Sequence, residues 1–179
     1  MDAQREPFLY VVVCAAGVAT GVSELIEAAR GRGWRVGVVA TPNSLAIVDR
    51  AALEAQTGLP VRCEWRAPGA SRPLPPPDAI AVAPATFNTV NKWAAGIADT
   101  LALAILCEAY GLGVPTAVHP RVNAALAAHP AYRAAVERLS GMGVRFPAKE
   151  QAQPRTAADD DAPFEWVTVL DLLGPPRLR

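Results

Sequence analysis

The stretch FLYVVVCA, residues 8–15, decides the fold of this chain. It is apolar throughout and rich in β-branched side chains, which is typical of a strand buried on both faces of a sheet. A turn of small residues follows, and apolar side chains then recur at the spacing of the buried stripe of a helix. A strand, a tight turn and an amphipathic helix in this order are the first half of a βαβ unit. The stripe consists of Val22, Leu25, Ile26 and Ala29.

The alternation of strand and helix continues along the chain. Further helices are predicted from Thr41, over 88–110 and over 123–140, with Pro130 able to interrupt the last one. Such alternation predicts a parallel sheet with right-handed crossovers and helices on both faces. The expected fold class is therefore α/β, a single-domain Rossmann-like (flavodoxin-like) doubly wound parallel sheet. Further strands are predicted over 35–40, 61–65, 78–83, 114–118 and 144–146.

The composition is that of one globular domain. With 179 residues, of which 51% are hydrophobic and 19% are charged, the chain can bury a single core. Its formal net charge is zero, so we expect no nucleic acid and no membrane among its partners. The three cysteines are far apart and form no CxxC pair. This favours a reduced, cytoplasmic protein and argues against a metal site.

Three loops are expected at the carboxyl edge of the sheet, where ligands of this fold class bind. The first, residues 14–21 (CAAGVATG), lets a ligand approach the backbone at Gly17 and leads into a helix start that favours an anion. It matches neither a GxGxxG motif nor a P-loop. On its own, such a segment is more often only a tight turn.

The second loop carries hydroxyl groups where a dinucleotide-binding fold has an acidic residue. Thr41 and Ser44 lie on either side of Pro42 and Asn43 at an expected helix start. Hydroxyls together with free N–H groups suit a phosphomonoester. Ordinary capping of the helix by these side chains is the alternative explanation.

The third loop, residues 84–101 (PATFNTVNKWAAGIADTL), follows a buried strand and starts a helix. Amides and exposed N–H groups there can read the polar edge of a flat heterocycle, and capping is again the alternative. The segment resembles the flavin-binding signature of the homo-oligomeric flavin-containing cysteine decarboxylases, which include phosphopantothenoylcysteine decarboxylase and the peptide decarboxylases of lantibiotic maturation. Pro84, Ala85, Thr86, Asn88, Thr89, Lys92, Gly96, Ile97, Ala98, Asp99 and Leu101 fit it, whereas Phe87 replaces a small Ala and Thr100 an Asn.

A second segment extends the resemblance. Pro120 and Asn123 fit the family's substrate-recognition motif, Pro-Ala-Met-Asn-x-x-Met, in which Arg121 here replaces the Ala. The resemblance implies FMN as the cofactor, a thiol as the substrate, and a homo-oligomer, expected to be a homotrimer or a multiple of one. The predicted helix over 88–110 agrees with an oligomer, because it is more apolar than one sheet requires.

The resemblance also implies domain boundaries. Residues 1–147 are expected to form the flavoprotein domain, and residues 148–179 a C-terminal extension. In the extension, the polar segment 149–162 is predicted to be a mobile loop. Residues 164–170 are predicted to be a strand that pairs at the sheet edge.

Roles for individual residues follow from the same resemblance. Thr41 and Ser44 would contact the phosphate of FMN, and Asn123 would face the carboxylate of the substrate. The flavin would lie against Gly17 and against the turn formed by Pro84, Ala85, Thr86, Phe87, Asn88 and Thr89.

The residues that serve decarboxylation are matched incompletely. Family decarboxylases oxidise a cysteine-derived thiol with FMN, and a His in the loop before the signature strand serves that chemistry. The corresponding loop here, residues 66–77 (RAPGASRPLPPP), contains no His. His119, at an expected strand end, is the candidate replacement, because an imidazole can act as a base near neutral pH. A structural role is the more common one for a lone His.

Two hypotheses about function follow. The first is a flavin-dependent redox enzyme that acts on a small or peptidyl thiol with altered catalytic residues. The second is a non-catalytic flavin-binding or assembly subunit that keeps the fold.

Overall fold

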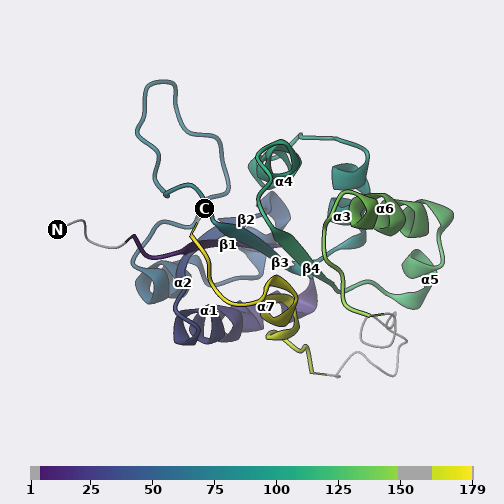
Figure 1. The fold of residues 1–179 in the computed structure, drawn as a ribbon, viewed down its shortest axis with the longest axis horizontal. Helices are drawn as coiled ribbons and strands as arrows, with labels where there is room; N and C mark the ends of the chain where they lie inside the picture. The colour runs from purple at the N-terminus through teal and green to yellow at the C-terminus, as the bar shows by residue number, and fades with distance from the viewer. Residues whose placement is uncertain (1–4, 149–162, 179) are drawn as a thin grey trace.

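The computed structural model describes residues 5–148 and 163–178. Within them, the centre of the molecule is a parallel sheet of four strands in the order β2-β1-β3-β4, with helices on both faces (Figure 1). The predicted fold class, a single-domain Rossmann-like doubly wound sheet, is therefore confirmed. The strands are β1 (Phe8–Val13), β2 (Arg35–Ala40), β3 (Ala79–Ala85) and β4 (Thr116–Pro120).

The two shorter strands predicted over 61–65 and 144–146 are not formed. Among the described residues, each segment contributes one bridge to an edge strand, through Arg62 at β2 and Arg145 at β4. Both segments then leave the sheet. Next to the second bridge, Pro147 has no N–H with which to extend a ladder.

Helices form a layer on each face of the sheet (Figure 1). One face carries α1, α2 and α7, and the other carries α3, α4 and α6, with the short α5 beside α6. No helix in the described part of the chain has the length and hydrophobicity needed to cross a membrane. The elements are η1 (Gly17–Gly21), α1 (Val22–Gly31), η2 (Pro42–Ala46), α2 (Arg50–Thr57), α3 (Phe87–Ala94), α4 (Leu101–Gly111), α5 (Ala124–Ala127), α6 (Pro130–Gly141) and α7 (Thr168–Leu173).

Strand β1 is buried on both faces, as its uninterrupted apolar sequence predicts. Leu9, Val11 and Val13 pack into the core that includes α1 and α7. Tyr10 and Val12 point the other way, into the core that includes α3, α4 and α6. Successive side chains of a strand point to opposite faces, so a strand between two helix layers must be apolar at every position.

The long helix predicted over 88–110 consists of two helices instead. The first, α3, ends at Ala94, and Gly96 follows with a φ of 74°. That left-handed conformation suits glycine and stops the helix. The second, α4, starts after Thr100, whose hydroxyl accepts a hydrogen bond from the N–H of Leu103 at 3.3 Å. The chain therefore turns between the two helices at residues inside the flavin-binding signature.

The edge strand predicted over 164–170 is also wrong, because this segment leads into helix α7. Trp166, Val169 and Leu170 are buried against the sheet face that carries α1. Their spacing of three and four residues is that of a helix stripe rather than of a strand. The predicted mobile loop over 149–162 lies outside the described residues.

Gly37 gives a test of how tightly β2 packs against the proline-rich loop of residues 66–77. A Cβ at Gly37 would lie 2.9 Å from side-chain atoms of Leu74, in that loop, and of Phe8. Both neighbours are buried, so relief requires the core to shift. We expect Gly37→Ala to lower the free energy of unfolding by about 1–3 kcal/mol in urea denaturation.

The matched control is Gly31→Ala, because a Cβ at Gly31 meets no atom of the described chain within 4 Å. It should leave stability unchanged or raise it by up to about 1 kcal/mol. Equal stability of the two variants would contradict this account of the packing around β2.

Candidate functional site

Backbone hydrogen bonds continue past the strand ends and hold the loops at one edge of the sheet. The N–H of Thr41, after β2, donates to the carbonyl of Val13 at 3.0 Å. The N–H of Arg121, after β4, donates to the carbonyl of Ala85 at 2.8 Å. Because parallel strands end at the same edge, the loops that follow all four strands meet there.

A cavity of about 600 Å³ opens between these loops. Its volume lies within the range of about 300–1,000 Å³ that is typical of small-molecule and cofactor sites. All three loops predicted from the sequence contribute to its lining, together with the segment after β4. The predicted cofactor residues that line it are Gly17, Thr41, Thr86, Phe87, Asn88 and Thr89.

The other three predicted cofactor residues are not part of the described lining of the cavity and lie beneath it. The hydroxyl of Ser44 is buried and donates to the carbonyls of Thr41 at 2.7 Å and Val13 at 3.1 Å. It therefore supports the second loop from below. Pro84 and Ala85 are buried in β3, and they position the turn that follows.

The starts of η2 and α3 are not capped by side chains of the described residues. Thr41 and Thr86 occupy the two N-cap positions, and neither side chain accepts a hydrogen bond from its helix. The hydroxyl of Thr86 instead lies 3.2 Å from that of Thr89. Capping, the alternative explanation for both loops, therefore does not apply, and the first N–H groups of α3 are available at the cavity.

The charged side chains at the cavity are cations. Of the described residues that line it, those with a titratable side chain are Lys92 and Arg121. Lys92 forms an ion pair with Asp99 at 2.5 Å, which offsets its charge. The guanidinium of Arg121 stays protonated at working pH. The charged residues in the described lining of the cavity are therefore both basic.

The residues that line the cavity after β4 were not predicted from the sequence. Arg121, Val122 and Leu126 line the cavity, and each differs from the residue of the family motif at its position, Ala, Met and Met respectively. Asn123 is exposed, and its side-chain oxygen caps α5 by accepting the N–H of Leu126 at 2.8 Å. The signal that could have pointed to Arg121 is a long cation directly after a buried strand, at the ligand-binding edge.

A protein-family model described as Flavoprotein matches residues 3–173. The chain belongs to the flavoprotein family. It is 27% identical over 169 residues to the coenzyme A biosynthesis bifunctional protein CoaBC of Thermococcus kodakarensis, a match that covers 89% of this chain and 42% of that protein. The chain thus spans less than half the length of this relative.

Solved structures of cysteine decarboxylases share the fold of this flavoprotein. Peptidyl-cysteine decarboxylase EpiD is similar with a TM-score of 0.72 and 18% identity, over 94% of this chain and 99% of that one. A cysteine-to-serine mutant of PPC decarboxylase has a TM-score of 0.73 and 18% identity, over 93% and 95%. The FMN-dependent cysteine decarboxylase SpaF has a TM-score of 0.70 and 23% identity, over 94% and 98%. The resemblance inferred from the signature is confirmed.

His119 of this flavoprotein lies on the other face of the sheet from α3 and is not among the described residues that line the cavity. Its ring stacks on Phe164, with 4.2 Å between ring centres and 22° between the planes. Burial lowers the pKa of His119 to about 4. A neutral, covered imidazole in this position acts in packing, so the geometry gives no support to a catalytic role.

The burial of His119 predicts a pH dependence of stability. The folded pKa of about 4 is below the ordinary value of about 6.5. The unfolded chain therefore binds the proton more readily, and stability is full above pH 6.5 and falls towards pH 4. Between pH 7 and pH 4, urea unfolding should show a loss about 3 kcal/mol larger in the wild type than in His119→Asn. Equal losses in the two proteins would show that His119 titrates normally.

Proposed function

We propose that this flavoprotein binds FMN in the cavity and acts as a flavin-dependent redox enzyme on a small or peptidyl thiol. The observation that carries the proposal is the meeting of the signature turn, Thr86 to Thr89, with Gly17 and Thr41 around one cavity. The relatives named above add to it, because their names describe FMN-dependent or cysteine decarboxylases. The alternative is a non-catalytic flavin-binding or assembly subunit. The named relatives are enzymes, which does not favour this alternative.

The cavity fits FMN in shape and in charge. A Cβ added at Gly17 would meet no atom of the described chain within 4 Å, so this position faces open space where a flat ring can approach. The uncapped N–H groups at the start of α3 and the amide of Asn88 can bind the polar edge of a heterocycle. Thr41 and Asn43 can donate hydrogen bonds to a phosphate. FMN would supply the two-electron oxidation of a thiol.

Arg121 supports a substrate that carries a carboxylate. Its side chain lines the cavity at the place where the family motif has a small residue. A guanidinium can bind a carboxylate through two parallel N–H···O bonds. The side-chain oxygen of Asn123 is used in the cap of α5, so its NH₂ group is the part that can assist.

None of the described residues that line the cavity is suited to act as a general acid or base. The described lining contains no His, Cys, Asp or Glu, and the guanidinium of Arg121 is a poor base. Cys14 lies buried beneath the signature turn, and burial raises the pKa of its thiol, which keeps it protonated. We therefore propose that proton transfer depends on the substrate or on water.

The first prediction from this proposal concerns the cofactor. The protein should bind FMN in preference to FAD or a nicotinamide nucleotide, measured by fluorescence titration after removal of any bound cofactor. Gly17→Leu should lower the FMN affinity by about tenfold or more, because the added side chain would fill the open space where the flat ring approaches. A tenfold change in Kd corresponds to about 1.4 kcal/mol of binding free energy. Gly31→Leu, on the exposed end of α1, is the matched control and should bind FMN normally. Tight binding of FAD or NAD without affinity for FMN would refute the proposal.

The second prediction concerns the reaction. CO2 release from phosphopantothenoylcysteine by the FMN-loaded protein should be about 10²- to 10⁴-fold slower than ordinary enzymatic turnover, because a positioned acid or base contributes that much. Turnover of roughly one per second or more would contradict this interpretation of the cavity. A peptidyl-cysteine substrate serves as the comparison, since either thiol class fits the proposal.

We further propose a cytoplasmic homo-oligomer, a homotrimer or a multiple of one. Tyr110, at the end of α4, and Ile97, between α3 and α4, are 63% and 43% exposed, and such apolar side chains favour association. The cysteines are free in the structure, as in a reducing compartment. Light scattering of the FMN-loaded protein should give a mass of at least three chains, and a monomer at micromolar concentration would overturn the proposal.

A further inference from the structure

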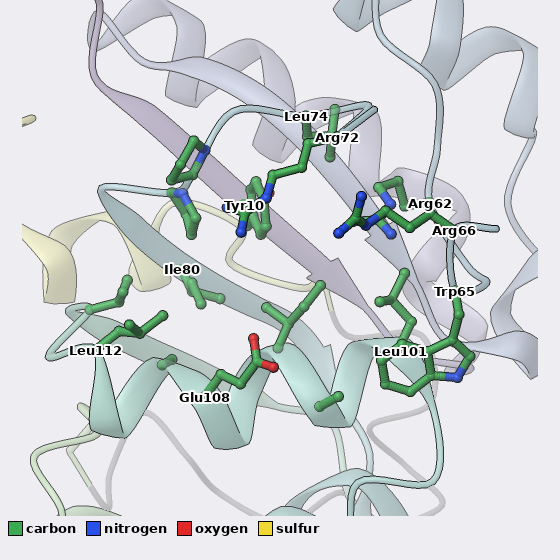
Figure 2. A pocket seen from close by; sticks show the side chains of 16 residues that line it. Tyr10, Arg62, Trp65, Arg66, Arg72, Leu74, Ile80, Leu101, Glu108 and Leu112 are labelled. Atoms are coloured by element: carbon green, nitrogen blue, oxygen red, sulfur yellow. The ribbon is translucent and has the colours of Figure 1, made fainter. Parts of the chain in front are cut away.

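A second cavity, of about 450 Å³, lies between helix α4 and the segment of residues 62–77 (Figure 2). Among the described residues, it shares no lining residue with the 600 Å³ cavity at the carboxyl edge of the sheet, where FMN is proposed to bind and which is called the flavin cavity below. Its floor is apolar and includes Leu74, Ile80, Ala104 and Ile105. Both its size and its apolar floor are typical of a small-molecule site.

Three arginines line the same cavity. Figure 2 shows Arg62 and Arg66 entering the hollow from the loop side, while Arg72 runs towards Tyr10. Glu108 reaches up from α4 on the opposite wall. In the part of the chain that the structure describes, none of the three guanidinium groups has a carboxylate within the 4.0 Å of an ion pair. The lining therefore carries a surplus of positive charge.

Two of these arginines influence the phenol of Tyr10, which also lines the cavity. Tyr10 is buried, and its hydroxyl donates to the carbonyl of Pro75 at 2.8 Å. Burial raises the pKa of Tyr10, and the charges of Arg62 and Arg72 act against that rise. The positive charges of Arg62, which is half-buried, and of Arg72, which is exposed, therefore both act on the Tyr10 side of the cavity.

The loop that carries the arginines is held in shape by its own residues. Pro73 and Pro75–77 each have a fixed φ angle. The guanidinium of Arg66 also donates to the carbonyl of Ala70, across the turn of this loop. Leu74 anchors the loop in the core next to Gly37. A preformed wall of this kind lowers the entropy that a ligand would lose on binding.

We propose that this cavity is a second binding site, for a small molecule that has an anionic head group and an apolar body. A carboxylate or phosphate head would bridge the guanidinium groups of Arg62 and Arg72, and such groups match guanidinium geometry. The apolar body would cover Ile80 and Ala104 on the floor. Trp65, which is 58% exposed at the rim, offers an aromatic face to that body.

The test uses calorimetric titration of the FMN-loaded protein, so that the flavin cavity is already filled. The probes are octanoate, octyl phosphate and 1-octanol, which share one apolar body and differ in the head group. We expect at least one anionic probe to bind at one molecule per chain, with the FMN retained, and 1-octanol to bind about tenfold more weakly or worse. Comparison of octanoate with octyl phosphate identifies the preferred head.

Variants locate the site. The double variant Arg62→Gln and Arg72→Gln should weaken the anionic probe by about tenfold or more. Ala104→Leu should weaken all three probes, because it fills the floor. Arg133→Gln, an exposed arginine of α6, is the matched control and should bind as the wild type does. Thermal unfolding of each variant confirms that it is folded.

Several results would overturn the proposal. Equal binding of 1-octanol and octanoate would show a hydrophobic surface without anion recognition. Unchanged binding in the double variant, or release of FMN by the probe, would place the ligand elsewhere. Absence of binding by all three probes at millimolar concentration would show that the cavity is not a binding site and that its arginines are hydrated surface charges.

Discussion

The site depends on the burial of β1 between two layers of helices. That burial fixes β1 at the centre of the sheet, hydrogen-bonded to β2 on one side and to β3 on the other. The start of the strand is held by Asp78, a buried carboxylate that accepts the N–H of Phe8 at 2.8 Å and pairs with Arg5. Because Asp78 is buried, its bond to the main chain of Phe8 favours this register of β1 against β3.

The chemistry of the flavin cavity follows from this register. Once the strands are aligned, their ends place backbone N–H groups, hydroxyls and amides around one space, and the described lining supplies no general base there. The site is therefore better suited to binding a flat anionic cofactor than to moving protons. Ser44 illustrates how the core supports it, because its buried hydroxyl ties the second loop to the end of β1 through the carbonyl of Val13.

The two cavities differ in how many carboxylates accompany their positive charges. In the flavin cavity, Lys92 is paired with Asp99, and Arg121 is the second cationic side chain of the lining. Along α4, the arginines of residues 62–77 face one glutamate, Glu108. A protein with zero net charge can thus hold two local surfaces that attract anions, because the field inside a low-dielectric hollow depends on nearby groups rather than on the total.

Local pattern was sufficient to place the four strands of the sheet and to indicate the family. The bounds of β2 agree with the predicted 35–40, because a buried strand is apolar along its whole length. The helical stripe of α7 was present in the sequence but was interpreted as a strand, since short apolar runs are ambiguous.

By itself, the sequence determined the α/β alternation and the order of the flavin-binding signature, since both are patterns of neighbouring residues. Only the tertiary structure decided which predicted residues share the cavity. Ser44 and His119 lie near the right strand ends, yet one bonds to main-chain carbonyls and the other stacks under Phe164, forty-five positions away in the chain. The direction of a side chain at a strand end depends on what packs against it, and those partners come from distant segments.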